Sequence, residues 1–379
     1  MKDHSLEVHG CHTYDATGAI SPSICLSATF RHPRFGESTG YDYGRVANPT
    51  RESLEKTVAL LERGGRSWAL SSGMAAVQLV FSLLSAGDHV LMSEDLYGGT
   101  VRLAEEVFAG YGITFEYVDV RDLALVGKRM RSETKLVFIE TPSNPMMQIA
   151  DIAALSALAH ENGALLAVDN TFLSPHFQKP LTLGADIVLH SGTKYLCGHN
   201  DVIAGFLVLK DATSAEAKRI ELLAKSAGPN LSALDSWLML RSIKTLGVRV
   251  ERQAENALAI AQWLGTLPEV TEVLYPGLAD HPGYALQQKQ ASGAGGMISF
   301  KVRSAEIAKA ALGKLHLIAF AESLGGVETL LTYPIAQTHA EMPAALLKRT
   351  GLDDKLLRLS VGIEDVEDLK ADLQQALQG

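Results

Sequence analysis

The sequence predicts an α/β protein: a large, mainly parallel sheet covered by helices on both faces, followed by a smaller C-terminal α/β domain. Short apolar and β-branched runs alternate with segments of helical period between residues 66 and 209. A long helical stretch over 233–264 then leads into further strand-like runs. This alternation indicates a mainly parallel sheet, because parallel strands need crossover connections that are usually helical.

Each expected strand is a short apolar run, and each expected helix repeats apolar residues at three- or four-residue spacing. The first helix of the large sheet begins near Asn48, carries Leu54, Val58 and Leu61 on one face, and has Thr50 as its candidate cap. The expected strands are 66–70, 89–92, 114–118, 135–140, 165–169, 187–190, 205–209, 296–302 and 356–361, and the further helices are 74–85, 100–110, 152–162, 233–264, 305–312 and 366–377.

The length of 379 residues suits two or three structural units. Residues 1–48 are rich in Gly, Pro, Ser, Thr and His, so we expect an N-terminal arm that is either disordered or packed on something else, such as another subunit. Residues 49–240 are expected to form the large domain, and residues 241–379 the C-terminal domain.

Charge and composition narrow the class of partner. The net charge of −9 and the pI near 5.8 argue against a nucleic-acid surface and against an anionic membrane. The N-terminus lacks the apolar segment of a signal peptide, and no run reaches the roughly 18 apolar residues of a membrane span. Three cysteines without CxxC spacing fit a reducing compartment. We therefore expect a cytoplasmic protein with free thiols.

Two of the expected strands end in residues suited to cofactor chemistry. Lys194 follows the strand at 187–190, and Asp169 ends the strand at 165–169. Ligands of such sheets bind beyond the carboxyl ends of the strands. A lone lysine there is usually a solvated loop residue, and a lone aspartate is more often a cap. Together they favour Lys194 as the Schiff-base lysine of pyridoxal 5'-phosphate (PLP) and Asp169 as the partner of its pyridine nitrogen.

Three loops offer further contacts to such a cofactor. Gly73 opens a helix whose N-terminal N–H groups suit a phosphate, although a plain serine cap would look the same. Tyr97 precedes two glycines and can stack on a flat ring, or lie buried beside the loop. Asn144 stands between two prolines that fix its backbone, as in a binding amide or an ordinary turn.

Arg358 interrupts an apolar strand and needs an anionic partner there. A substrate carboxylate held by the guanidinium fork would serve, and so would an internal ion pair. The glycine-rich loop 320–326 is a further candidate binding segment. His190 and His199 lack a third ligand nearby in the sequence, so we expect no metal.

Taken in order, these motifs make the chain closely resemble the Cys/Met-metabolism family of PLP enzymes, over essentially its whole length. That family includes cystathionine γ-synthase, cystathionine γ- and β-lyase, methionine γ-lyase and O-acylhomoserine sulfhydrylase. The resemblance implies the type I, aspartate-aminotransferase-like PLP-dependent transferase fold. The motifs that carry it are Tyr43-Gly-Arg45, Asn48-Pro-Thr-Arg51, Ser71-Ser-Gly-Met74, Tyr97-Gly-Gly-Thr100, Ser143-Asn-Pro145, Val168-Asp-Asn-Thr-Phe172, His190-Ser-Gly-Thr-Lys194, Glu322-Ser-Leu-Gly-Gly326 and Arg358-Leu-Ser-Val-Gly362.

The resemblance also implies roles for individual residues. Lys194, Tyr97 and Asp169 would be catalytic, with Tyr97 stacking on the ring and assisting proton transfer. The arm would reach the neighbouring subunit, which implies an obligate dimer and normally a homotetramer made of two dimers. The phosphate would be bound by Gly73, Met74, Ser191 and Thr193 and by Tyr43 and Arg45 of a neighbouring subunit, and the amino-acid substrate by Asn144, Ser323 and Arg358.

The reaction within the family depends on few positions. Glu322 resembles the γ-synthases and γ-lyases, whereas β-lyases often carry an apolar residue there. Asp42 resembles the γ-synthases but also occurs in some bacterial β-lyases, and Val46 replaces a second arginine found in some synthases. We expect a cystathionine γ-synthase acting on an O-acylhomoserine, of which the acetyl ester is favoured, with O-acetylhomoserine sulfhydrylase activity as an addition. A cystathionine lyase is the alternative.

A hypothesis from a different functional class is a non-catalytic regulator or small-molecule binding protein of the same fold. The presence of Lys194, Asp169, Tyr97 and Arg358 argues against it, because a protein that had lost catalysis would be free to lose them.

Overall fold

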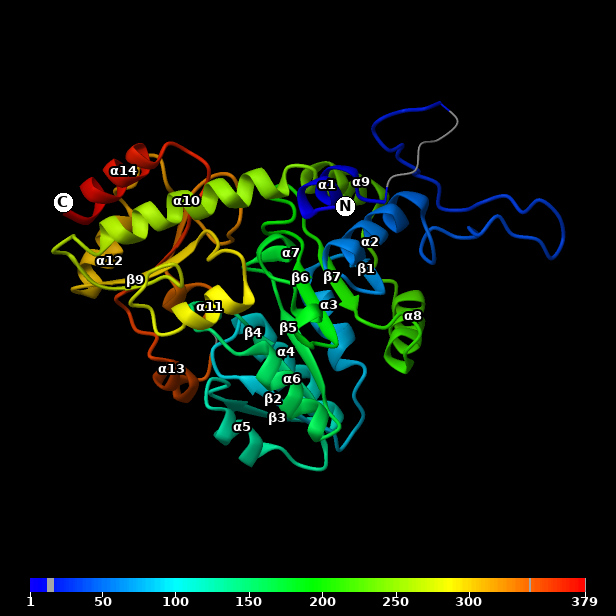
Figure 1. Cartoon of the computed structure of the whole chain (residues 1–379), viewed down its shortest axis with the longest axis horizontal. Helices are drawn as coiled ribbons and strands as arrows, with labels where there is room; N and C mark the ends of the chain where they lie inside the picture. The colour runs from blue at the N-terminus through cyan, green and yellow to red at the C-terminus, as the bar shows by residue number, and fades with distance from the viewer. Residues whose placement is uncertain (12–16, 341, 379) are drawn as a thin grey trace.

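The computed structural model describes residues 1–11, 17–340 and 342–378. Its larger sheet has seven strands in the order β1-β7-β6-β5-β4-β2-β3. The pairs β2·β3, β2·β4, β4·β5 and β5·β6 are parallel, while β7 runs antiparallel to both β1 and β6. The predicted α/β fold with a mainly parallel sheet is thereby confirmed (Figure 1).

The elements follow one another in a regular alternation in the first two thirds of the chain. The strands are β1 Arg66–Leu70, β2 His89–Ser93, β3 Thr114–Val118, β4 Thr134–Glu140, β5 Leu165–Asp169, β6 Ile187–Ser191, β7 Gly205–Leu209, β8 Val270–Leu274, β9 Met297–Val302, β10 Ala319–Phe320, β11 Leu330–Thr332 and β12 Leu356–Ser360. The helices are α1 Asp3–His9, α2 Pro49–Leu61, α3 Gly73–Phe81, α4 Gly98–Leu103, α5 Leu123–Arg129, α6 Ile152–Glu161, α7 Ser174–Phe177, α8 Ala215–Ala227, α9 Ala233–Ile243, α10 Leu246–Leu264, α11 Tyr284–Gln290, α12 Ala305–Leu312, α13 Ala344–Thr350 and α14 Val366–Gln378. Four short helical turns are η1 Ala104–Phe108, η2 Ala109–Tyr111, η3 Pro180–Leu183 and η4 Pro334–Ala336.

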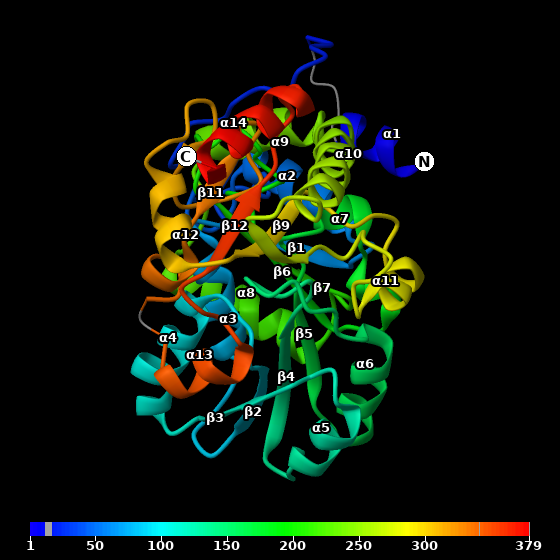
Figure 2. The same cartoon turned by 90° about the vertical axis from the view of Figure 1, so that its left-hand side faces the viewer.

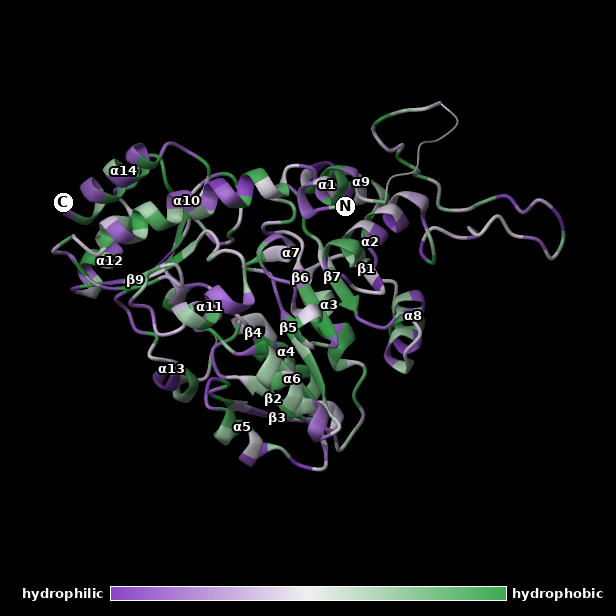
Figure 3. Cartoon of the chain, in the orientation of Figure 1, coloured by the Kyte–Doolittle hydropathy of each residue, from purple (hydrophilic) through white to green (hydrophobic). Residues whose placement is uncertain are grey.

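Both faces of the large sheet are buried, because successive side chains of a strand point to opposite faces. In β4, Val137 and Ile139 join the core formed with α2, α6 and α9, while Leu136 and Phe138 join the core formed with α3 and α8. Figure 3 shows the resulting concentration of hydrophobic residues along the sheet and α3. This two-sided burial holds the carboxyl ends of β4, β5 and β6 in fixed positions.

The C-terminal part builds a second, five-stranded sheet in the order β10-β11-β12-β9-β8. Its strands are antiparallel except for the pair β10·β11. Helices α10, α12 and α14 share its core, and α10 lies beside both sheets (Figure 2). The second, smaller unit that the sequence predicts is present, and β12 brings Arg358 toward the large sheet.

The prediction of one long helix over 233–264 is wrong, because the segment forms two helices, α9 and α10, separated at Lys244 and Thr245. Side chains compete for the last carbonyl groups of α9. The Thr245 hydroxyl and the Arg249 guanidinium both donate to the carbonyl of Ser242, at 3.1 Å each. These bonds occupy the carbonyl that a continuing helix would pair with the N–H of Leu246.

The expected helix over 100–110 is present, but it is divided. It begins as α4, continues as the π-helical turn η1, and ends in the 3₁₀ turn η2 before Gly112, which adopts a left-handed backbone. The cap expected at Thr50 is also wrong. Asn48 caps α2 by accepting from the N–H groups of Thr50 and Arg51, at 3.0 and 3.3 Å, because Pro49 occupies the first helical position.

The N-terminal arm is partly packed on its own chain. Helix α1 lies against α2 and α10, and Leu6 is buried in the core of the large sheet. The blue segment between α1 and α2 extends away from the rest of the fold (Figure 1). None of the helices in the described part of the chain has the length and apolar character needed to cross a membrane.

Candidate active site

A cavity of about 250 Å³ lies at the carboxyl ends of the central strands, where ligands of α/β sheets bind. It collects residues from both sheets and from the loops between them. Its lining comprises Ser72, Gly73, Met74, Val77, Tyr97, Thr100, Glu140, Asn144, Asp169, Thr171, Phe172, Ser191, Thr193, Lys194, Ile203, Glu322, Ser323, Leu324, Thr338 and Arg358. Eleven of the residues expected at the site from the sequence therefore meet in this one cavity: Gly73, Met74, Tyr97, Asn144, Asp169, Ser191, Thr193, Lys194, Glu322, Ser323 and Arg358.

The amine of Lys194 donates to the Ser323 hydroxyl at 2.8 Å. Burial, helped by the nearby Arg358 guanidinium and opposed by Glu322, lowers the pKa of Lys194 from 10.5 to about 8. At pH 7 an amine with this pKa is neutral in about a tenth of the molecules, which is a few hundred times the neutral fraction of an ordinary lysine. Lys194 can therefore act as a nucleophile or a base near neutral pH.

Asp169 lies at the end of β5, and its carboxylate accepts from the backbone N–H of Thr171 at 3.0 Å and from the Thr171 hydroxyl at 2.5 Å. The same hydroxyl accepts from the N–H of Ser191 at 2.9 Å, so Thr171 joins the ends of β5 and β6. Burial raises the pKa of Asp169, and the hydrogen bonds from Thr171 oppose that change. A ring cation placed beside this carboxylate would stabilise its charged form.

His190 lies beneath this edge of the sheet and takes part in a buried polar cluster. Its Nε2 lies 2.6 Å from Oε1 of Glu62, and both side chains are almost completely buried. The same carboxylate oxygen accepts from the Asn170 amide at 2.9 Å. His190 therefore has a carboxylate partner next to the Asp169 segment, and it is not in contact with His199, which lies against Ser242.

The N-terminus of α3 faces the end of β6. Ser72 caps the helix by accepting from the N–H of Ala75 at 3.1 Å. A Cβ atom on Gly73 would lie 2.9 Å from Cβ of Ser191, so only glycine permits this approach. The first N–H groups of α3 are thereby placed next to the Ser191 and Thr193 loop, which suits a phosphate group. The Thr193 hydroxyl already donates to the carbonyl of Ala204 at 3.2 Å.

Arg358 is 1% exposed, yet the described residues give its guanidinium no carboxylate in ion-pair contact. It donates to Oδ1 of Asn144 at 2.7 Å and, at 3.3 Å each, to the carbonyl of Ser323 and the hydroxyl of Thr332. Within the described part of the chain its Nε has no hydrogen-bond partner. Burial lowers the pKa of Arg358 to about 10. The internal ion pair considered from the sequence is thus not what the structure shows, and the guanidinium has capacity left for an anionic ligand.

Glu140, which lines the cavity, and His339, which lies behind Asn144, were not singled out from the sequence as site residues. Glu140 accepts from the backbone N–H of Tyr97 at 3.1 Å, and burial together with the neighbouring Asp169 raises its pKa well above the ordinary value. His339 contacts the carbonyl of Asn144 through Nε2 at 3.0 Å, and burial lowers its pKa to about 4. A neutral imidazole that donates here helps to fix Asn144. The only sequence signal for Glu140 was its position at a strand end.

Tyr43, Arg45 and Asp42 lie outside this cavity. The Arg45 guanidinium stands 5.7 Å from the centre of the Tyr43 ring and donates to the carbonyl of Lys225. Asp42 accepts from the Ser38 hydroxyl at 2.6 Å. The expected contact of these residues with a cofactor in the neighbouring subunit remains a prediction.

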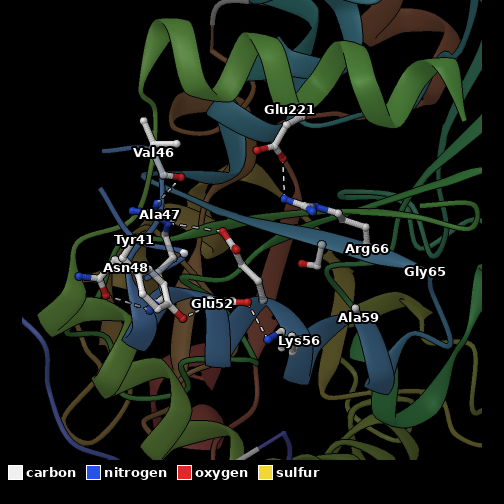
Figure 4. A pocket seen from close by; sticks show the side chains of 14 residues that line it. Tyr41, Val46, Ala47, Asn48, Glu52, Lys56, Ala59, Gly65, Arg66 and Glu221 are labelled. Atoms are coloured by element: carbon white, nitrogen blue, oxygen red, sulfur yellow. Dashed lines mark hydrogen bonds and ion pairs between the residues drawn. The ribbon is translucent and has the colours of Figure 1, made fainter. Parts of the chain in front are cut away.

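A second cavity, of about 320 Å³, lies between the arm and α2 (Figure 4). Three cationic side chains line it, and each pairs with a glutamate. The pairs are Arg51 with Glu55 at 3.5 Å, Lys56 with Glu52 at 2.6 Å, and Arg66 with Glu221 at 2.5 Å. Because its charges are already matched in this way, this cavity is a weaker candidate for an anionic cofactor than the one beside Lys194.

The fold and the Lys194 cavity together define a protein of the PLP-enzyme type. The model of the Cys/Met metabolism PLP-dependent enzyme family matches residues 4–378, and the chain belongs to this family. Its activity is accordingly PLP-dependent transsulfuration chemistry on amino-acid substrates.

Relatives with this fold carry different reaction names. The chain is 47% identical to a cystathionine γ-lyase of Bacillus subtilis over the full length of both chains. It is 46% identical to a cystathionine γ-synthase/O-acetylhomoserine (thiol)-lyase of the same species, over 96% of this chain and 92% of that one. The crystal structure of cystathionine γ-lyase from Lactobacillus plantarum complexed with L-serine superposes with a TM-score of 0.95 at 42% identity, covering 99% of this chain and 98% of the other.

Proposed function

We propose that the chain is a cystathionine γ-synthase that forms cystathionine from an O-acylhomoserine, preferably the acetyl ester, and cysteine. The observation that carries the γ-type reaction is the position of Glu322, and Asp42, which resembles the γ-synthases, favours the synthase among the γ-type enzymes. Glu322 lines the cavity together with Lys194 and Arg358 and contributes to the electrostatics of both. A glutamate at this position resembles the γ-synthases and γ-lyases, whereas β-lyases often carry an apolar residue there.

The lining residues fit PLP. Gly73, Met74, Ser191 and Thr193 surround the N-terminus of α3 and would hold the phosphate, while Tyr97 would stack on the ring and Asp169 would face its nitrogen. When bound, the cofactor supplies an electron sink for the carbanion formed at the substrate Cα. Asp169 keeps the ring nitrogen protonated, because an adjacent carboxylate favours a cation.

Lys194 is proposed as the base and proton carrier. Its amine would take a proton from Cα of the substrate and then one from Cβ, so that the γ-acyloxy group could leave. Its lowered pKa supports this role. The hydrogen bond to Ser323 holds the amine on the side of the cavity that also contains Arg358.

Arg358 and Asn144 are proposed to bind the α-carboxylate of the substrate. The free Nε of Arg358 and the 2.7 Å bond that orients its fork toward Asn144 support this role. Ser323, whose carbonyl accepts from the same guanidinium, would complete the contact region.

A cystathionine γ-lyase is the second candidate, because the 47% identical relative carries that name and Glu322 suits it equally. The sulfhydrylase reaction, in which an inorganic sulfide replaces cysteine, is a further activity of the same γ-replacement type. A β-lyase is less well supported, since Glu322 is charged.

Product analysis decides between these reactions. The purified PLP-loaded protein is incubated with O-acetylhomoserine plus cysteine, and separately with cystathionine alone. Cystathionine formation in the first mixture supports the synthase. Pyruvate and homocysteine from the second mixture, with little synthesis in the first, would replace the proposal by a β-lyase, and 2-oxobutyrate and cysteine would replace it by a γ-lyase.

We also propose that two chains share each active site within a homotetramer built from two dimers. The arm supports this, because it extends from the fold and leaves Tyr43 and Arg45 outside their own cavity (Figure 1). Arg45→Ala and Lys194→Ala chains, each inactive alone, should regain part of the activity when they are unfolded and refolded together. No gain over the separate variants would contradict shared sites.

A further inference from the structure

Two histidines and two glutamates from three helices meet on the side of the molecule where α1 packs on α10. Nε2 of His4, in α1, lies 3.3 Å from Oε1 of Glu251, in α10. Nε2 of His176, in α7, lies 3.4 Å from the same oxygen. We propose that His4, His176 and Glu251 bind a divalent transition metal, with Zn²⁺ as the best fit. This site is separate from the PLP cavity and does not depend on the proposed reaction.

The spacing of the ligand atoms supports tetrahedral coordination. Ligands at 2.0–2.1 Å from a zinc ion lie roughly 3.3 Å from one another in a tetrahedron. The two histidine-to-Glu251 distances already have this length. One ligand atom of each of the three residues lies within 4.8 Å of the others, so the third edge closes by a small side-chain rotation. Two imidazoles and one carboxylate form a common zinc ligand set that leaves a fourth position for water.

Glu7 orients one of the histidine ligands from behind, as a carboxylate commonly does in zinc sites. It is 3% exposed, its Oε1 lies 2.7 Å from Nδ1 of His176, and its Oε2 accepts from the N–H of Gly247 at 3.1 Å. In this position the Glu7 carboxylate accepts a hydrogen bond from Nδ1–H of His176, so that the lone pair on Nε2 points toward Glu251. This carboxylate–histidine arrangement fixes the imidazole for metal binding.

The alternative is a set of histidine–glutamate ion pairs without metal. In that case each Nε2 would carry a proton toward Glu251, and His176, whose Nδ1 faces Glu7, would need a proton on both ring nitrogens to donate to both carboxylates. A bound cation meets the same need with neutral imidazoles. The position also makes a metal useful, because it would join the N-terminal helix to α10 and to α7, which directly follows the segment of Asp169.

The site is open enough for exchange. His4 and Glu251 are 59% and 45% exposed in their side chains, whereas His176 is 8% exposed. The ion can therefore enter from the side of His4, and substitutions of His4 or Glu251 leave the core intact.

The test is a zinc titration of the chelator-treated, PLP-loaded protein against a chromophoric zinc chelator at neutral pH. We expect one Zn²⁺ per chain. The dissociation constant should rise about tenfold or more in His4→Ala and in Glu251→Gln, and it should not change in His9→Ala, which alters an exposed histidine of the same helix. Cobalt should give the visible absorption of a tetrahedral site in the wild type and in His9→Ala only.

Two results would overturn the proposal. One is a wild-type protein that takes up no stoichiometric zinc. The other is equal affinity in the wild type and in both the His4→Ala and Glu251→Gln variants, which would assign the binding to another place on the surface.

Discussion

Replacing Arg358 by lysine keeps the positive charge and removes the planar fork, so it isolates the contribution of bidentate binding. In the structure the guanidinium uses its donors on Asn144, Ser323 and Thr332, and its Nε has no partner. A lysine ammonium can satisfy some of these acceptors, but it cannot present two parallel N–H groups to a carboxylate. The substitution should therefore weaken substrate binding while the cofactor remains bound.

The size of the effect follows from one lost charge-assisted hydrogen bond, worth about 1.5–3 kcal/mol. That energy corresponds to a fall in kcat/KM of about 10- to 150-fold. Steady-state kinetics with O-acetylhomoserine and cysteine measure it, and the visible absorbance of the bound cofactor checks that the protein is loaded.

Arg249→Lys is the matched control for this experiment. Arg249 is also buried, at 4% exposure, but its contacts are the carbonyls of Tyr195 and Ser242 and the hydroxyl of Thr245. That variant should lose thermal stability without the same loss in kcat/KM. If Arg358→Lys stays within twofold of the wild type, the guanidinium fork does not hold the substrate carboxylate.

Three further predictions concern charge and stability. The pKa of Lys194 is lowered to about 8, mainly by burial. The rate at which the cofactor-free protein recombines with PLP should therefore rise as the pH passes through about 8 and level off above it. A rate that keeps rising to pH 10.5, the ordinary pKa of lysine, would contradict this. Glu62→Ala should reduce the free energy of unfolding by about 3–5 kcal/mol in urea titrations, because it leaves His190 buried without its carboxylate and Asn170 with the Gln178 carbonyl as the remaining acceptor of its amide. A loss below about 1 kcal/mol would be inconsistent with a buried pair. Asp372→Ala should lower the free energy of unfolding by about 2–3 kcal/mol at neutral pH, because the carboxylate accepts from the N–H groups of residues 316–318. Burial by itself would raise the pKa of Asp372, but these bonds hold it below 3.8. The difference from the wild type should therefore shrink once the pH falls below 3.8 and be lost as the pH passes through the lower pKa of the folded protein, and a difference that stays constant would refute this.

Sequence patterns predicted the parts of the fold where burial and period agree. The strands that carry Asp169 and precede Lys194 were expected within a residue of their observed ends, because they are short apolar runs between polar loops. The short strands β8, β10 and β11 and the helices α5, α8, α11 and α13 were not predicted. The strands β8 and β10 are short and largely exposed, so no alternation of buried residues marks them, whereas α8 does carry Ala217, Ile220 and Ala224 at helical spacing and was missed.

The site was predicted to the extent that its residues lie in motifs. Lys194, Asp169 and Arg358 were identifiable because each places a charge at the end of, or within, an apolar strand. The role of Thr171 as a link between β5 and β6, and that of His339 behind Asn144, come from contacts between distant segments. Such contacts leave no local pattern, so the sequence could not reveal them.

The break between α9 and α10 shows the same limit in the fold itself. Apolar spacing continues through residues 244 and 245, and the interruption arises from the side chains of Thr245 and Arg249 bonding to one carbonyl. Helical period reports which face is buried, but it does not report competition for the last backbone groups of a helix.

The role of the Lys194 amine is tested most directly by comparing the turnover of Lys194→Ala with that of Lys210→Ala. Lys210 is an exposed lysine that follows β7 as Lys194 follows β6. Cystathionine formation from O-acetylhomoserine and cysteine should fall about a thousandfold or more in Lys194→Ala, with a changed cofactor absorbance, and should stay at the wild-type level in Lys210→Ala. A small primary amine added to Lys194→Ala should restore part of the rate. Turnover by Lys194→Ala near the wild-type rate would contradict the central role of this amine.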